Sequence, residues 1–166
     1  MTTRTIDVFN GDADGLCALH QLRLVEPVDS ELVTGPKRDI SLLKRVKAQA
    51  GDRVTVLDIA LSKNRDALDK LLEAGAQVRY FDHHQPGDIP VHPHFEPHID
   101  TDANVCTSLL VNQYLQGRQL AWAVTAAFGD NLADAARQAA APLNLSTGQL
   151  AQLQSLGECL NYNGYG

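Results

Sequence analysis

The chain has 166 residues, of which 44% are hydrophobic, and its formal net charge at pH 7 is -6. This length is enough for one domain with a sizeable core, and the acidic balance argues against an extensive nucleic-acid-binding surface in this segment. The three cysteines are widely spaced, which excludes the usual patterns of a zinc ribbon or a disulfide scaffold. No secretory leader and no apolar run of transmembrane length is recognisable, so the sequence predicts a soluble, cytoplasmic protein with no membrane partner.

The first half of the chain alternates short apolar runs with segments of helical periodicity. Strands are expected at residues 5–10, 31–34, 53–57 and 77–81. Helices are expected at residues 16–25, 40–48 and 62–74. Strands that alternate with helices through short loops are typical of βαβ units. The predicted fold class is therefore α/β, with a Rossmann-like parallel sheet and flanking helices.

The second half of the chain has a different character. Residues 85–98 contain four prolines and are expected to form an extended loop. Beyond Asp102 the sequence predicts a helical C-terminal segment, with helices at residues 105–116, 120–128, 132–141 and 147–160. We interpret residues 1–160 as one domain, and the loop-like residues 161–166 as the start of a linker to a further domain.

Acidic residues and histidines follow three of the predicted strands. Asp12 and Asp14 follow the first strand, Asp58 follows the third, and Asp82-His83-His84 follows the fourth. Open α/β sheets bind ligands outside the carboxyl ends of their strands, so we expect these side chains to share one site. So many like charges need protons or metal ions to neutralise them, and aspartate together with histidine suits divalent cations.

Each of these features also has a simpler interpretation. Asp12 and Asp14 could form a solvated turn, Asp58 could be a helix cap, and His83 and His84 could belong to a polar loop. Asp130 could end one helix or cap the next one. Lys37 and Arg38 either meet substrate phosphates at the rim of the cleft or form a solvated pair. For the histidines of the proline-rich segment, at positions 92, 94 and 98, a solvated loop is favoured over a metal cluster.

Four ordered segments together resemble the DHH phosphoesterase superfamily. They are residues 9–15 (FNGDADG), 56–58 (VLD), 81–84 (FDHH) and 128–131 (FGDN). The resemblance covers nearly the whole chain and lies closest to the RecJ-like and poorly characterised branches. It implies a site for two Mn²⁺ ions, with Mg²⁺ as an alternative, and many members of the family carry a second domain.

The resemblance also implies roles for individual residues. Asp12 and Asp14 would each bind one ion, Asp58 would bridge the two ions, and His83 and Asp130 would complete the ligand set. His84 would contact the phosphate that is cleaved. From the residues themselves, Asp82 is expected to orient a histidine ring as a hydrogen-bond acceptor. Asn10 lies near the first acids but is a weaker ligand than histidine.

One position departs from the family pattern. Several members, including the pyrophosphatases, have a ligand histidine four residues before the first aspartate, and this chain has Val8 there. A pyrophosphatase is therefore disfavoured.

The sequence predicts a metal-dependent hydrolase that acts on a phosphodiester or phosphomonoester, such as a nucleotide or a short oligonucleotide. The alternative is a non-catalytic module of the same fold that binds a nucleotide or phosphate. A dinucleotide-binding Rossmann domain is disfavoured because no G-x-G-x-x-G follows the first strand. Homodimer formation stays open.

Overall fold

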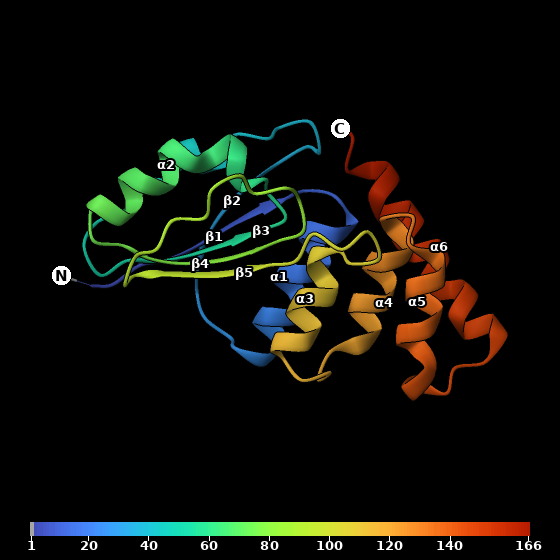
Figure 1. Cartoon of the computed structure of the whole chain (residues 1–166). Coiled ribbons are helices and arrows are strands. Elements are labelled where there is room, and N and C mark those ends of the chain that lie inside the picture. Colours follow the sequence, from blue (N-terminus) through green and yellow to red (C-terminus); the bar gives the residue numbers. More distant parts are fainter. Residues whose placement is uncertain (1) are drawn as a thin grey trace.

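The sheet holds the molecule together and places the site. In the computed structural model, which describes residues 2–166, five parallel strands lie in the order β2-β1-β3-β4-β5 (Figure 1). Their bounds are β1 Thr5–Asn10, β2 Glu31–Gly35, β3 Arg53–Leu57, β4 Gln77–Asp82 and β5 Phe95–Ile99. The helices and 3-10 turns are α1 Ala13–Val25, η1 Leu42–Arg45, α2 Leu61–Glu73, α3 Thr107–Tyr114, α4 Leu120–Gly129, α5 Ala133–Ala140, η2 Ala141–Leu143 and α6 Thr147–Asn163.

The two faces of the sheet are covered by different helices. Alternate residues of a strand point to opposite faces, so each central strand contributes to two cores. Val8, Val56 and Tyr80 pack with the leucines of α2 and η1 on one face. On the other face, Phe9 packs with Leu57 and with residues of α1 and α3. Figure 1 shows α2 on one side of the sheet and α1 and α3 on the other.

The C-terminal helices form a layer of their own beside α1 and α3. In Figure 1, α3, α4, α5 and α6 lie side by side, and α4 packs against α1, α3, α5 and α6. A third cluster of buried side chains joins α4 with α5 and includes Val124, Phe128 and Ala136. This layer brings the end of α4 to the same edge of the sheet as the ends of β1, β3 and β4.

The strand order reverses between β1 and β3. The chain passes from β1 to β2 on one side and then crosses back, so that β3 lies on the other side of β1. Such a reversal opens a crevice at the carboxyl ends of the two strands, which is where ligands bind in open α/β sheets. Asp12 follows β1 and Asp58 follows β3, so both lie at the edge of the sheet where the strand order reverses.

The α/β class, the parallel sheet and the helical C-terminal segment are confirmed, but three local predictions were wrong. The proline-rich segment is not all loop, because β5 pairs in parallel with β4 and has Pro97 opposite Tyr80. Proline is tolerated there because β5 is an edge strand, where one side of the backbone has no strand to bond. The helix expected at 40–48 is only the 3-10 turn η1, and α6 continues through Asn163 into the expected linker.

Among residues 2–166, no helix combines the length and the apolar character that crossing a membrane would require.

Candidate active site

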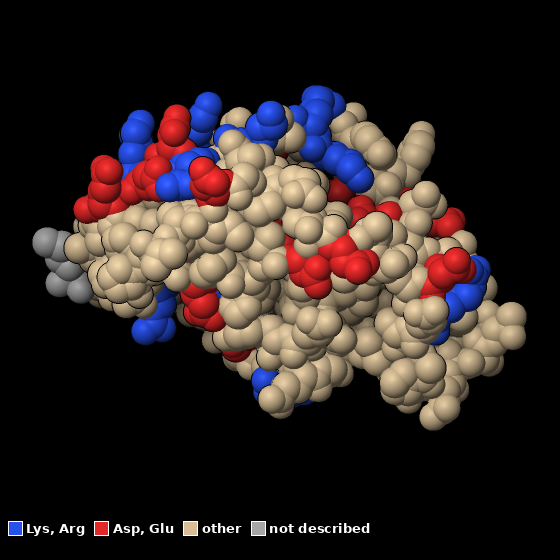
Figure 2. Space-filling view, in the orientation of Figure 1, with Lys and Arg blue, Asp and Glu red and all other residues tan. Residues whose placement is uncertain are grey.

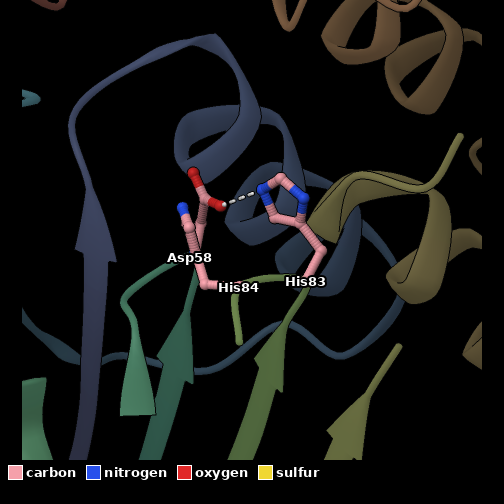
Figure 3. Close-up of side chains that lie close together, drawn as sticks. All are labelled: Asp58, His83 and His84. Carbon is pink, nitrogen blue, oxygen red and sulfur yellow. Dashed lines mark ion pairs between the residues drawn. The ribbon is translucent and has the colours of Figure 1, made fainter. Parts of the chain in front are cut away.

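The imidazole of His83 lies among three carboxylates at the carboxyl end of the sheet. Its Nε2 atom is 3.3 Å from Oδ1 of Asp58, 3.7 Å from Oδ2 of Asp14 and 3.8 Å from Oδ2 of Asp130. Asp58 and His83 face one another from the ends of neighbouring strands (Figure 3). Two sets of possible ligand atoms each fall within 4.8 Å of one another: Asp58 with His83 and His84, and Asp14 with His83 and Asp130. Segments distant in the sequence therefore supply donors to one small volume.

The carboxylate of Asp14 is held by the first turn of α3. The backbone N–H of Thr107 donates to Oδ2 at 2.9 Å, and that of Ser108 donates to Oδ1 at 2.7 Å. The N–H groups at the start of a helix have no partner within it and carry a partial positive charge, so they stabilise the ionised acid. Burial nevertheless raises the pKa of Asp14 above its ordinary value, against the opposing effect of His83.

Asp58 occupies an unusual backbone conformation directly after β3. Its φ angle is 62°, and its N–H donates to the carbonyl oxygen of Phe81 at 3.0 Å. Left-handed residues other than glycine are uncommon and concentrate at functional sites. The hydroxyl of Thr107 donates to Oδ1 of Asp58 at 3.0 Å. Burial, together with the charges of Asp14 and Asp12, raises the pKa of Asp58 well above its usual range.

Asp130 closes the site from the end of α4. It is the C-cap of that helix, and the next residue, Asn131, has a φ angle of 61°, which ends the helical path. Of the two simpler roles considered for Asp130, it ends α4 but does not cap the next helix, because Leu132 is the N-cap of α5. Burial and the charge of Asp14 raise the pKa of Asp130 to about 7.

The electrostatics of this cluster fit a divalent cation. Three carboxyl groups have raised pKa values because each is desolvated and lies near other acids. A cation among them would offset the repulsion and allow all three to ionise. Carboxylate oxygens together with an imidazole nitrogen suit Mn²⁺, and a set richer in oxygen also suits Mg²⁺. The donors of Asp14, Asp58, Asp130 and His83 are therefore chemically suited to hold such an ion.

Figure 2 shows acidic side chains beside a group of basic ones on this face of the molecule. Lys37 and Arg38 follow β2, and Nζ of Lys37 lies 3.2 Å from Oδ2 of Asp12. A positive charge therefore borders the acidic cluster, which suits an anionic ligand.

His84 lies at the mouth of the cluster and is oriented by Asp82. Its Nδ1 atom is 2.7 Å from Oδ1 of Asp82, which is completely buried, whereas the His84 side chain is 46% exposed. The hydrogen bond to Asp82 raises the pKa of His84 above its ordinary value. Oδ2 of Asp82 is a buried oxygen without a hydrogen-bond partner among the described residues. Asp82 thus holds the ring with its Nε2 edge free for another partner.

Asp12 makes different contacts from the other acids. It is the N-cap of α1, and its Oδ1 atom accepts a hydrogen bond from the N–H of Gly15 at 3.0 Å. Its Oδ2 atom is 3.2 Å from Nζ of Lys37. Burial works against the protonated form of Lys37, but the charge of Asp12 and a hydrogen bond to it prevail and raise the pKa of Lys37. Within residues 2–166, neither set of clustered ligand atoms includes Asp12.

Other candidate residues lie at or beyond the edge of the site. Asn10 supports the turn, because its Oδ1 atom accepts a hydrogen bond from the N–H of Asp12 at 3.1 Å. Arg38 donates to the carbonyl oxygen of Tyr165 at 2.7 Å and is not part of the acidic cluster. In the proline-rich segment, His98 pairs with Glu96. The histidines at 92, 94 and 98 belong to neither set of clustered donors among residues 2–166.

Thr107 and Ser108 were missed by sequence reasoning. Their N–H groups and the Thr107 hydroxyl hold two of the acids, yet residues 105–116 were predicted only as one helix. Two adjacent hydroxyl residues near an expected helix start were the available signal. Asp14, to which the first residues of α3 donate, lies more than ninety residues earlier in the chain. Its position beside α3 therefore depends on the fold.

This chain is an α/β domain with a strand-order reversal and acids at its strand ends. It is similar over nearly its whole length to two solved structures. One is the DHH domain of a protein described as a member of a family of ribosomal proteins, with 14% identity and a TM-score of 0.70 over 97% of this chain. The other is an uncharacterized protein from Helicobacter pylori G27, with 12% identity and a TM-score of 0.52 over 98% of this chain.

The fold of the chain is therefore a DHH-type fold, as the resemblance implied. The matches span 47% and 56% of the two other chains, so this chain corresponds to about half of each. No protein-family model matches the sequence, and no curated protein does.

Proposed function

We propose that this chain is a metal-dependent phosphoesterase that hydrolyses a phosphodiester or a phosphomonoester. The observation that supports this proposal is the convergence of Asp14, Asp58 and Asp130 on Nε2 of His83. A structural ion pair needs one acid, whereas three acids around one imidazole, two of them buried, leave negative charge that a divalent cation would neutralise. A DHH-type fold agrees with the proposal and does not by itself establish the chemistry.

In the proposed reaction, Asp14, Asp58, His83 and Asp130 hold Mn²⁺, with Mg²⁺ as the alternative. A divalent cation held by these residues would supply Lewis acidity, which would activate water near neutral pH and offset charge on the phosphoryl oxygens. The α3 N-terminus fixes the carboxylate of Asp14, and the Thr107 hydroxyl fixes that of Asp58. These contacts keep the ligands in place before the substrate arrives, which lowers the cost of organising the site.

His84 is the proposed catalytic residue that touches the substrate. Its Nδ1 atom is engaged by Asp82, and its raised pKa favours the protonated ring. Nε2–H of His84 can then donate to a phosphoryl oxygen and stabilise the charge that develops there during cleavage. Nucleotides and short oligonucleotides are the substrates we propose, since a site at the strand ends could meet a phosphate at the end of a chain or between two nucleosides.

The test is a hydrolysis assay over phosphoesters of increasing size. It covers an aryl phosphomonoester, an aryl phosphodiester, a cyclic dinucleotide and a short oligonucleotide, each with Mn²⁺, Mg²⁺ or EDTA. We expect Mn²⁺-dependent turnover that Asp58→Ala abolishes and that Asp66→Ala, an exposed acid on α2, retains. Circular dichroism checks that both variants fold. Near wild-type turnover by Asp58→Ala would remove Asp58 from the mechanism.

A second candidate function is phosphate or nucleotide binding without hydrolysis. The ammonium of Lys37 favours it, because it places one cationic group beside the end of β1 without metal. This alternative predicts nucleotide binding that survives EDTA, with no product formed at any metal concentration. Turnover in the assay above excludes it.

A further inference from the structure

Asp12, the acid that follows β1, makes different contacts from the other three acids of the site. Asp12 has both carboxylate oxygens engaged, Oδ1 by the N–H of Gly15 and Oδ2 by the ammonium of Lys37. Asp14, Asp58 and Asp130 instead point donor atoms at His83. The cluster is thus divided into a lysine-neutralised acid and a group of three acids that a cation could neutralise.

Val8 is a second reason why an ion is not expected at Asp12. It is completely buried in the apolar core between the sheet and α2, with Val56 and Leu42 in the same cluster. A valine side chain has no atom that can coordinate a cation. The end of β1 therefore offers Asp12 little help in holding an ion of its own.

Lys37 is held in place by groups other than Asp12. Its Nζ atom lies 3.3 Å from Oδ1 of Asn161 and 5.5 Å from the centre of the Tyr165 ring. Its backbone N–H donates to the carbonyl oxygen of Gly164 at 2.7 Å. Gly164 lies so close to the α1 N-terminus that an added Cβ would be 2.7 Å from Cα of Asp12. The end of α6 therefore fixes the lysine over the acid.

We infer that the Lys37 ammonium takes the place of one divalent cation, so that the chain binds a single ion through Asp14, Asp58, His83 and Asp130. This inference rests on the proposed metal site and changes the number of ions it holds. A compact ammonium beside Asp12 supplies one positive charge without needing further ligands.

The test is the stoichiometry of Mn²⁺ binding, measured by calorimetry and by electron paramagnetic resonance. We expect one ion per wild-type chain, with the hyperfine pattern of an isolated Mn²⁺ centre. In Lys37→Ala, the loss of a neighbouring positive charge should tighten binding of that ion, on the order of fivefold. A second, weaker ion should then bind near Asp12 at high Mn²⁺ concentration.

Two further variants act as controls. Lys37→Arg keeps the charge and should keep the stoichiometry of one. Lys44→Ala removes a positive charge from an exposed position on η1 and should leave both affinity and stoichiometry unchanged. Thermal unfolding checks that each variant is folded.

The outcomes separate this inference from the function it rests on. Two exchange-coupled Mn²⁺ ions in the wild-type chain would overturn the inference and leave the proposed metal-dependent function standing. An unchanged affinity and stoichiometry in Lys37→Ala would also overturn it. A wild-type chain that binds no Mn²⁺ would overturn the proposed function together with the inference.

Discussion

The carboxylate of Asp58 and the imidazole of His83 meet 3.3 Å apart across the ends of the adjacent strands β3 and β4. The register of the sheet sets up this contact, because Leu57 lies opposite Phe81 and each strand ends at or just beyond that pair. An acid and an imidazole placed in this way can be neutralised by a proton or by a cation. Whether a proton or a metal ion neutralises them determines how the stability of the chain, its affinity for Mn²⁺ and its rate of hydrolysis respond to pH and to substitutions.

The first prediction concerns the stability of the metal-free chain. The pKa of Asp130 is about 7 in the folded chain against an ordinary value of 3.8, so the folded state binds an extra proton between these values. The stabilisation this gives is complete below about pH 4 and is lost as the pH rises through about 7. In EDTA, the free energy of unfolding should therefore fall between about pH 4 and 7, by on the order of 1 kcal/mol per pH unit, and level off above that.

Urea denaturation across this pH range is the measurement. Asp130→Asn should flatten the profile and make the metal-free chain more stable at the alkaline end. Asp134→Asn, at an acid whose side chain is 99% exposed, should follow the wild type. A wild-type profile that is flat, or that rises with pH, would contradict the raised pKa of Asp130.

The second prediction concerns the hydrogen bond between Asp82 and His84. His84→Ala should reduce kcat by on the order of 10²–10³, the loss expected when one donor to the phosphoryl oxygens is removed. Asp82→Asn should shift the alkaline limb of the pH–rate profile to lower pH, because the hydrogen bond to Asp82 is the main cause of the raised pKa of His84. His94→Ala, an exposed histidine, is the control. An unshifted limb in Asp82→Asn would separate His84 from the rate-limiting protonation.

The third prediction concerns Thr107, whose hydroxyl holds Asp58 and whose backbone holds Asp14. Thr107→Val keeps the shape and the backbone N–H but loses the hydroxyl. Mn²⁺ affinity should weaken by about 10–100-fold, as is typical when the support of a ligand is removed. Titration calorimetry measures this, with the exposed Thr101→Val as control. Equal affinities in the two variants would show that the hydroxyl of Thr107 does not organise the site.

Much of this arrangement could be predicted because strand ends are visible in the sequence. The apolar runs before Asp12, Asp58 and Asp82 each end at a polar residue, and parallel strands bring such ends to one edge. β5 could not be found in the same way, since its pairing with β4 is a long-range contact and Pro97 argues against a strand. Propensity acts locally, whereas this strand depends on an edge that only the folded sheet provides.

The contacts that tune the site were beyond the reach of sequence reasoning. The pairing of Lys37 with Asp12 depends on β2 lying beside β1, and the hydrogen bonds to Asp14 depend on where α3 begins. The helical end of α6, which fixes Lys37, was expected to be loop. Each of these contacts joins segments far apart in the chain. Residue patterns alone can therefore indicate candidate site residues but not which residues contact one another.

The central claim is that Asp14, Asp58 and His83 hold a divalent cation at the carboxyl end of the sheet. The most direct measurement is an anomalous difference map, collected at the manganese absorption edge, from crystals grown with MnCl₂. We predict a peak enclosed by these three side chains in the wild-type chain, and its loss in Asp58→Ala. A wild-type map without density at this position, in crystals whose Mn²⁺ lies elsewhere, would contradict the claim.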